Sequence, residues 1–413
     1  MGKSYLKYVL NNTPDKILQY KNEKITFKKV NYDLTSKAPT YNEIINNYTD
    51  YLENYLENKE VIHIDLTAGF DTRTVLALIY NRYKKKIIAY TLGKDGMDFQ
   101  VASKIAKHFK LTHRNSSTTF SDSTEFIRHS KFLALCKNGD ANSIRAIDKI
   151  DLNYQATIPK IIGVYGTIKF GKYTIGDIEF SQYQKLISKN KHKIEFFSDN
   201  LIDELKSRLF NYLIELKATY NDRNQEIYYI RERCGNWGNV VFNSTWNLRH
   251  ICPFEDIIAM QNMLSLPKNI RRTTKIQHKI LFQFSKFLYL YPINRNPFNN
   301  DYFSFIPEKS RLFIRKAWTY YEKKFERLFR KNIRDIAAQR LDKFHNYFSE
   351  YVKPMLKRQN SLNKYVLSND NKEKLINNFE QNKVGVNHIA QLYTMELWKD
   401  LVDSMTSVKR VFK

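Results

Sequence analysis

The chain of 413 residues is 42% hydrophobic and 27% charged, a composition typical of a globular protein with a sizeable core. Its 68 Lys and Arg exceed 42 Asp and Glu, and the net charge of +26 favours an anionic partner such as nucleic acid, an anionic membrane surface or a phosphorylated substrate. The three cysteines are widely spaced, which argues against a disulfide framework and a thiolate zinc site. The N-terminus lacks the apolar core of a signal peptide, and no run of 18 apolar residues suggests a membrane span. These features predict a cytoplasmic protein.

Residues 1–58 are predicted to form a small N-terminal lead-in of strands and one helix. The alternating residues 24–30 indicate a strand. Over residues 40–58, apolar side chains recur at three- and four-residue spacing, which predicts a helix. Thr40 and Glu43 have the spacing of a capping box, so the helix is expected to begin there.

Residues 59–300 alternate between strand and helix patterns and are predicted to form one α/β domain. In chain order we expect a strand at 60–66, a helix at 73–80, a strand at 86–92, a helix at 98–109, a short strand at 111–115, a helix at 123–136 and a strand at 158–166. This alternation predicts a parallel sheet. Ligands of such sheets bind at the carboxyl ends of the strands. The glycine-bearing segments 67–72 and 163–171 are therefore expected to face one site.

The remaining residues are predicted to be largely helical, with a modest break near 291–300 and with helices at 199–216, 224–233 and 254–266. Residues 301–413 are interpreted as a basic helical C-terminal region, with helices within 307–350 and 369–413. Basic and aromatic residues mix at 309–340, as they do in RNA-binding surfaces, but an amphipathic helix with inward aromatics is the favoured interpretation. A bias toward Lys, Asn, Ile and Tyr, as an AT-rich genome produces, accounts equally well for much of the charge.

The segment Thr67-Ala68-Gly69-Phe70-Asp71-Thr72 connects an apolar strand to a helix. Its small residues let backbone N–H groups approach an anion, and the following helix N-terminus adds free donors and a favourable partial charge. The hydroxyls of Thr67 and Thr72 can donate to phosphate oxygens, and Asp71 is suited to holding Mg²⁺ or anchoring the loop. The segment matches neither GxxxxGK[ST] nor GxGxxG. The alternative is an ordinary turn in which Asp71 or Thr72 caps the helix.

This loop resembles the SGGxDS loop of the N-type ATP pyrophosphatases, and DLTAGFDTR is similar to the form found in asparagine-synthetase-like proteins. Further segments follow in the order of that family: Tyr90-Thr91-Leu92-Gly93, Asp98 with Ala102 and Ala106, and the segments 163–173, 249–256 and 266–267. The resemblance covers about residues 60–300. It implies a parallel sheet of the adenine-nucleotide alpha-hydrolase type (PP-loop, HUP-like) with a largely helical C-terminal part.

Members of this family bind ATP with Mg²⁺, adenylate a carboxylate with release of pyrophosphate, and let an amine attack the acyl-adenylate to form an amide. The resemblance implies that Asp71 and Arg295 are catalytic and that Asp71 binds the metal, with Arg249 and Asp256 as further contacts. It also implies nucleotide contacts from Thr67, Ala68, Gly69, Asp71, Thr72, Thr91, Gly93, Gly163 and Gly166. The implied reactants are a carboxylate (a small acid, a sugar acid or a peptide) and an amine donor, in a biosynthetic amide ligase.

The chain departs from the family pattern in its second half. Val164, Thr167 and Ile168 stand where the family has acidic residues. The basic residue of the family, usually a Lys, has Arg295 as its candidate here, with Lys275 and Lys279 as other candidates, and an Arg cannot carry a proton. No Cys precedes Cys136, so no glutaminase domain is expected and the amine must come from free ammonia, a second substrate or a partner. Two alternatives stay open: a degenerate, non-catalytic nucleotide-binding subunit, and a tRNA-modifying PP-loop enzyme that binds RNA with a steep salt dependence.

Overall fold

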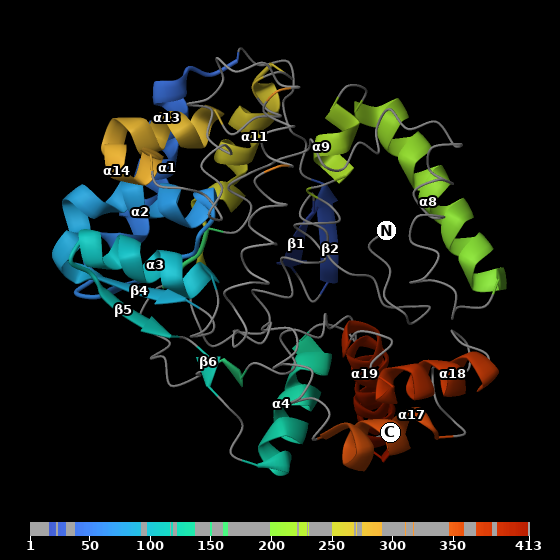
Figure 1. Ribbon diagram of the computed structural model, residues 1–413. Coiled ribbons are helices and arrows are strands. Elements are labelled where there is room, and N and C mark those ends of the chain that lie inside the picture. The colour runs from blue at the N-terminus through green and yellow to red at the C-terminus, as the bar shows by residue number, and fades with distance from the viewer. Residues whose placement is uncertain are drawn as a thin grey trace.

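The computed structural model describes residues 16–21, 24–29, 38–91, 97–115, 117–118, 122–136, 149–150, 160–163, 199–220, 223–228, 230, 250–267, 270, 275–290, 310, 317, 347–358, 369–381 and 386–411. Within these residues, strands alternate with helices through the first half of the chain, and helices dominate the second half. In Figure 1 the sheet lies in the upper part of the view with helices from both halves of the chain, and α4 lies below with α17, α18 and α19.

The N-terminal residues contain a hairpin and a capped helix. Strands β1 (Lys16–Lys21) and β2 (Lys24–Lys29) pair in antiparallel fashion, which confirms the predicted strand. Helix α1 (Tyr41–Leu56) begins at the predicted capping box. The N–H of Glu43 donates to Oγ1 of Thr40 at 3.2 Å, and the N–H of Thr40 donates to Oε2 of Glu43 at 2.6 Å. These bonds satisfy two donors at the start of the helix, where no intrahelical acceptors exist.

A five-stranded parallel sheet organises the upper part of the molecule. Its strands lie in the order β5-β4-β3-β8-β9, and each neighbouring pair is parallel. Their bounds are β3 (Ile62–Asp65), β4 (Ile87–Thr91), β5 (Thr112–Asn115), β8 (Lys160–Ile161) and β9 (His250–Ile251). The chain first adds strands on one side of β3 and then on the other, as in doubly wound, Rossmann-like sheets. The predicted α/β fold with a parallel sheet is confirmed, whereas the two-residue strand β9 was not predicted.

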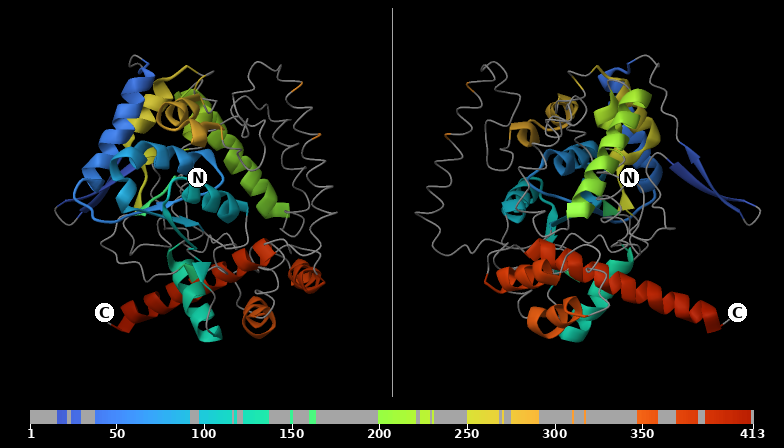
Figure 2. Two further views of the ribbon diagram at one scale, coloured as in Figure 1. Left: turned by 60° about the vertical axis from the view of Figure 1, so that its left-hand side comes forward. Right: turned by 90° about the vertical axis from the view of Figure 1, so that its right-hand side faces the viewer.

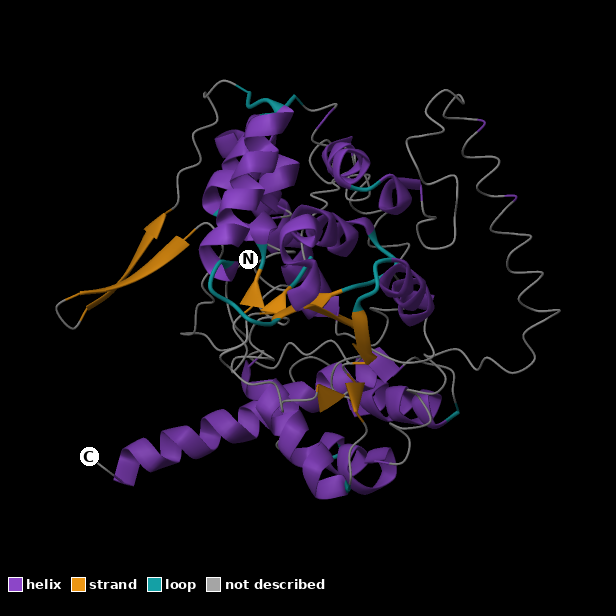
Figure 3. Ribbon diagram, turned by 90° about the vertical axis from the view of Figure 1, so that its left-hand side faces the viewer, coloured by secondary structure: helices purple, strands orange, loops and turns teal. Residues whose placement is uncertain are grey.

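One face of this sheet is apolar and is covered by helices. Its side chains form a single core with helices α1, α2 (Phe70–Tyr83), α3 (Met97–His108) and α13 (Lys275–Phe284), and they are Ile62, Ile64, Ile87, Ala89, Ile161 and Ile251. Figure 3 shows these helices gathered above the strands. Because side chains alternate along a strand, the opposite face carries polar groups, namely His63, Asp65, Tyr90 and Lys160.

The second part of the molecule, called the C-terminal cluster here, joins α4 (Ser123–Cys136) to the last helices of the chain. These are the π-helical turn η8 (Phe348–Val352), α17 (Lys353–Leu356), α18 (Asn369–Glu380) and α19 (Val386–Val411). Phe126 of α4 shares one buried core with Phe348, Phe379, Tyr393 and Trp398. The end of α19 extends away from the other helices (Figure 2). The helices predicted at 123–136 and within 369–413 are confirmed, and domain boundaries at 58 and 300 stay predictions.

The other described elements are short or peripheral. Helices α8 (Asp199–Tyr220), α9 (Asn224–Tyr228) and α11 (Ile257–Ser265) share a small core, and their bounds differ by a few residues from those predicted. The remaining elements are η1 (Lys84–Lys86), β6 (Ser117–Thr118), β7 (Lys149–Ile150), η5 (Pro253–Glu255) and α14 (Lys286–Leu290). The predicted break near 291–300 and most of the basic, aromatic segment 309–340 lie outside the described residues. No helix within the described ranges combines the length and apolarity that crossing a membrane requires.

Candidate functional site

The predicted loop begins two residues after β3 and is shorter than expected. Helix α2 starts at Phe70, so Phe70, Asp71 and Thr72 form its first turn rather than a loop. Gly69 is the N-cap, with an extended backbone at φ −79° and no side-chain capping bond, so the interpretation of Asp71 or Thr72 as the cap is wrong. The N–H groups of the first turn have no intrahelical acceptors. They are accompanied by the positive end of the helix dipole, a combination that suits an anion.

Two threonine hydroxyls close the turn from β3 into α2. Oγ1 of Thr72 accepts the N–H of Thr67 at 3.0 Å, and the two Oγ1 atoms lie 3.0 Å apart. Oγ1 of Thr67 also accepts the N–H of Gly69 at 3.2 Å. The two hydroxyl groups therefore fix the backbone conformation of the turn, and their Oγ1 atoms lie next to the start of α2.

Both backbone polar groups of Ala68, in the middle of the turn, are held by side chains. The N–H of Ala68 donates to Oδ1 of Asp98, at the start of α3, at 2.9 Å. Nη2 of Arg73, a fully buried side chain, donates to the carbonyl oxygen of Ala68 at 2.9 Å. Ala68 is itself buried and does not have a positive φ, which explains why the family's glycine is not required there. The N–H of Ala68, which was expected to donate to phosphate, donates to the carboxylate of Asp98 instead.

Gly163 brings the end of β8 against this turn. A Cβ atom at Gly163 would lie 2.6 Å from the backbone nitrogen of Thr72 and 2.8 Å from the carbonyl carbon of Asp71. Both contacts are with backbone, so no side-chain rotation relieves them. Strands β3 and β8 are neighbours at the point where the strand order reverses, the place where ligands of such sheets bind. Gly163, in the second glycine-bearing segment, therefore lies against the first segment, and a shared ligand site stays a prediction.

Thr91 ties the end of β4 to the same edge of the sheet. Its hydroxyl donates to the carbonyl oxygen of Leu66 at 2.5 Å and lies 2.9 Å from Nε2 of His113. Since the single hydroxyl proton is already used, Nε2 of His113 must be the donor to Thr91. Nδ1 of His113 then accepts from Oγ of Ser103 at 2.9 Å. Burial lowers the pKa of His113, which favours this neutral form. Thr91 therefore positions Leu66, directly before the turn.

Tyr48 of α1 is buried against η5. Its ring meets Phe254 of η5 edge to face, with the centroids 5.2 Å apart. Burial raises the pKa of the Tyr48 hydroxyl far above its ordinary value, and the Cys252 thiol and the carboxylates of Asp71 and Asp256 raise it further. Asp256 also caps α11 by accepting the N–H of Ala259 at 3.0 Å. Two carboxylates from separate segments thus act on one buried phenol.

The polar face of the sheet holds a partly buried ion pair close to the turn. Nζ of Lys160 lies 2.8 Å from Oδ1 of Asp65, and the Lys160 side chain is only 9% exposed. Next to it, the ring of His63 meets Tyr90 at 4.9 Å between centroids. Burial, with smaller contributions from Lys160 and Arg114, lowers the pKa of His63 from 6.5 to about 4. His63 is therefore neutral at physiological pH.

The structure brings together most, but not all, of the predicted site residues. Six of them lie around the start of α2, namely Thr67, Ala68, Gly69, Asp71, Thr72 and Gly163. Thr91 bonds to Leu66, directly before the turn. The predicted residues Gly93, Gly166, Arg249 and Arg295, and the departures Val164, Thr167 and Ile168, lie outside the described residues. Within the described part of the chain, no three His, Cys, Asp or Glu side chains gather as a metal site. The assignment of Mg²⁺ to Asp71 stays a prediction.

Several neighbours of the turn were not identified from the sequence as site residues. Tyr48 interrupts a buried row of isoleucines and leucines on α1, and His63 and Asp65 alternate with isoleucine in β3. In each case a polar residue stands in a row of residues that is otherwise apolar, and this pattern could have identified it as a candidate site residue.

No protein-family model matches this chain, and no curated protein matches it either. The resemblance to asparagine-synthetase-like proteins therefore rests on the motifs alone.

Proposed function

We propose that this chain is an ATP-dependent ligase of the asparagine-synthetase-like type, with a PP-loop sheet and without a glutaminase domain. It would adenylate a carboxylate, release pyrophosphate and pass the acyl group to an amine. The observation that carries the proposal is the contact of Gly163 with the first turn of α2, at the reversal point of a parallel sheet. A glycine in that place leaves two strand ends close together around a helix N-terminus, which suits a phosphate chain.

The residues present fit a magnesium-bound triphosphate. The N–H groups at the start of α2 and the Oγ1 atoms of Thr67 and Thr72 would hold phosphate oxygens. Asp71, in the first turn, would bind Mg²⁺, which takes one or two carboxylates together with phosphate oxygens. ATP supplies the phosphoanhydride bond whose cleavage activates the carboxylate. Fixed N–H donors stabilise the charge that develops on the departing pyrophosphate. The cytoplasm, where ATP is abundant, is the location that this proposal implies.

A second candidate is a nucleotide-binding subunit without catalysis. Val164, Thr167 and Ile168 replace the acidic residues of the family motif. In addition, the N–H of Ala68 is already bonded to Asp98. Such a subunit would bind Mg·ATP and release no pyrophosphate.

Binding and turnover of ATP separate these candidates. We expect the purified protein to bind Mg·ATP with micromolar affinity in titration calorimetry and to release pyrophosphate with members of a carboxylate and amine panel. Asp71→Asn should weaken Mg·ATP binding about tenfold or more, since it removes a charged ligand. Asp50→Asn, an exposed acidic site on α1, is the control and should bind like the wild type.

Three other outcomes would point elsewhere. Binding without pyrophosphate release supports the non-catalytic subunit. Tight, salt-sensitive binding of tRNA in preference to small carboxylates supports the tRNA-modifying alternative. Folded protein that neither binds Mg·ATP nor releases pyrophosphate contradicts the proposal as a whole.

A further inference from the structure

Exposed lysines lie at the end of the sheet opposite the turn. Strands β4 and β5 are parallel neighbours in which Ile88 pairs with Thr112. The chain enters β4 directly from η1 and enters β5 shortly after the last turn of α3, so both approaches lie at the amino ends of the strands. The turn between β3 and α2 lies at a carboxyl end. The exposed lysines, called the lysine surface here, are Lys84, Lys85, Lys104, Lys107, Lys110 and Lys286.

Aromatic rings from three helices lie among these lysines. The hydroxyl of Tyr80 in α2 donates to the carbonyl oxygen of Phe109 at 3.2 Å, and the two ring centroids are 4.6 Å apart. Phe287 of α14 follows Lys286, and its centroid lies 5.8 Å from that of Phe109. Phe287 also stacks on His108 of α3, with the centroids 3.6 Å apart. His108 remains exposed, and the other three rings are half-buried. The lysine surface therefore borders a partly exposed aromatic cluster.

Carboxylates do not neutralise the lysine surface. The segments 84–91, 99–110 and 275–290 contain no Asp or Glu. Within the described part of the chain, none of the six lysines forms an ion pair, and Glu53 of α1 pairs with Arg82 instead. In the C-terminal cluster, by contrast, Lys353, Lys357 and Lys399 all pair with acidic residues. A compositional bias would act on both regions alike, so it does not explain this difference.

Lys110 has a backbone conformation that favours glycine. Its φ is 53°, and no other non-glycine residue among those described has a positive φ. The N–H of Leu111 donates to the carbonyl oxygen of Ala106 at 2.9 Å, and the N–H of Lys110 donates to that of Lys107 at 3.2 Å. These are the two bonds of a Schellman motif, in which glycine is usual because a Cβ is strained there. The chain therefore keeps a basic side chain where glycine would be less strained.

We propose that the lysine surface, together with the rings of His108 and Phe287, binds a single strand of nucleic acid. Ammonium groups without ion-pair partners attract the phosphates, and partly exposed rings offer faces on which bases stack. An anionic membrane fits less well, because interfacial binding needs an apolar helix face, and the exposed residues described on α3 are all polar or charged. The 14 residues of α2, about 20 Å long, separate this surface from the turn. The inference therefore goes beyond the proposed ligase function and does not depend on it.

The test measures fluorescence anisotropy of labelled oligo(U) and oligo(dT), each about 12 nucleotides long. The double variant Lys107→Ala, Lys110→Gly removes two charges and places a favoured residue at position 110. At about 0.1 M salt it should bind about tenfold more weakly, and the slope of log K against log salt should fall by about 1.4, as two lost phosphate contacts require. It should unfold at the wild-type temperature or above it, so the weaker binding does not come from unfolding.

His108→Ala separates stacking from charge. It should weaken binding about fivefold, the scale of one stacked base, and leave the salt slope unchanged. If the double variant loses affinity and His108→Ala does not, phosphate attraction acts without stacking, and the assignment to a single strand is overturned.

The double variant Lys217→Ala, Lys374→Ala is the matched control. It removes the same charge from exposed positions on α8 and α18, which lie on the right of Figure 1, whereas α3 and α14 lie on the left. Its affinity and salt slope should equal those of the wild type. Equal losses in the two double variants would show a response to net charge alone and would overturn the proposal.

The remaining outcomes also have a definite meaning. Preference for one oligonucleotide supports the proposal and identifies the strand as RNA or DNA. A wild type that binds neither oligonucleotide overturns it, and binding to vesicles that contain phosphatidylserine would then assign the surface to a membrane. Binding of Mg·ATP should be the same in all variants. A wild type that binds an oligonucleotide but not Mg·ATP contradicts the proposed function and leaves this inference standing.

Discussion

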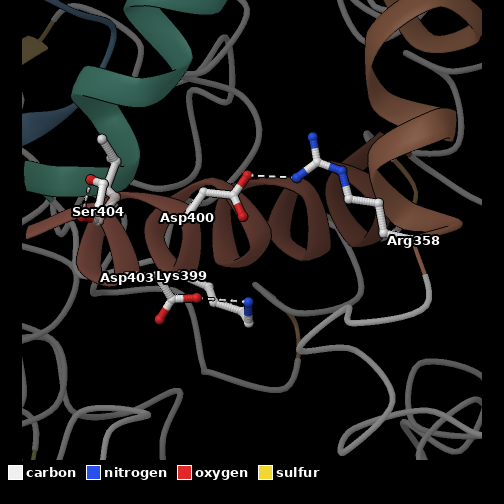
Figure 4. Close-up of polar contacts among 6 residues, drawn as sticks. Arg358, Lys399, Asp400, Asp403 and Ser404 are labelled. Carbon is white, nitrogen blue, oxygen red and sulfur yellow. Dashed lines mark hydrogen bonds and ion pairs between the residues drawn. The ribbon is translucent and has the colours of Figure 1, made fainter. Parts of the chain in front are cut away.

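The turn between β3 and α2 and the C-terminal cluster differ in what their polar groups bond to. Around the turn, charged and polar side chains are buried, among them Arg73, Thr91 and Lys160. In the C-terminal cluster, the ion pairs Lys353–Glu380, Lys357–Glu373, Arg358–Asp400 and Lys399–Asp403 lie at the surface, and Figure 4 shows two of them along α19. Burying polar groups costs folding free energy. The cluster also buries polar side chains, among them Lys372 and Glu396. The turn differs because Arg73 and Thr91 bond to the backbone of the turn and of Leu66 directly before it, which fixes the shape of the turn.

The largest effect is expected from breaking the aromatic core of the C-terminal cluster. Phe126 is fully buried and stacks on Tyr347 with the centroids 4.2 Å apart. Phe126→Ala should lower the free energy of unfolding by about 3–5 kcal/mol, because it leaves a large cavity. Urea denaturation measures this loss. The remaining folded protein should bind Mg·ATP with unchanged affinity, and a loss below about 1 kcal/mol would contradict the core assignment.

Gly163→Ala should affect both stability and binding. Its Cβ would lie 2.6 Å from the backbone of Thr72, so β8 or the start of α2 must move, at a cost of about 2–3 kcal/mol. Denaturation and calorimetry should show lower stability together with weaker Mg·ATP binding. Gly69→Ala is the matched control, because its Cβ would approach only Oγ1 of Thr67, at 3.4 Å. Similar losses in both variants would show that the contact at Gly163 has no special role.

Acid should weaken the sheet region through His63. Its folded pKa of about 4 lies below the ordinary 6.5, so the unfolded chain binds more protons between these values and stability falls as pH decreases from 6.5 to 4. The expected loss is about 2 kcal/mol after allowance for solvent screening. His63→Gln should flatten this part of the pH profile, whereas His108→Gln, an exposed site on α3, should not. An identical profile in the wild type and His63→Gln would refute the assignment.

The smallest effect is expected at the surface of the C-terminal cluster. Arg358→Ala removes the pair with Asp400, whose atoms lie 2.7 Å apart and whose side chains are 52% and 41% exposed. The expected loss is below about 1 kcal/mol, and 1 M salt should remove most of it because exposed charges are screened. Chemical denaturation with urea at two salt concentrations measures both quantities. A loss of several kcal/mol would mean that the ion pairs stabilise the cluster as strongly as its core does.

Local patterns were predicted well because they depend on residues three or four positions apart. Thr40 and Glu43 bond to each other as their spacing indicated, and the apolar periodicity of α1, α3 and α4 placed those helices. The strand-helix alternation also predicted the parallel sheet. The start of α2 was predicted three residues too late, because Gly69 ends the turn without a side-chain cap.

The turn at 67–72 was therefore recognisable from sequence, and its neighbours were decided by tertiary structure. The contact of Gly163 with Thr72 and the bond of Asp98 to Ala68 join residues about 90 and 30 positions apart, and the ring contact of Tyr48 with Phe254 joins residues about 200 positions apart. The pairing of α4 with α19 spans most of the chain. A single sequence carries no periodic signal for such contacts, because they depend on how whole elements pack and not on local spacing. The sequence determined where the glycine-bearing turn between β3 and α2 stands, and the fold determined which side chains surround it.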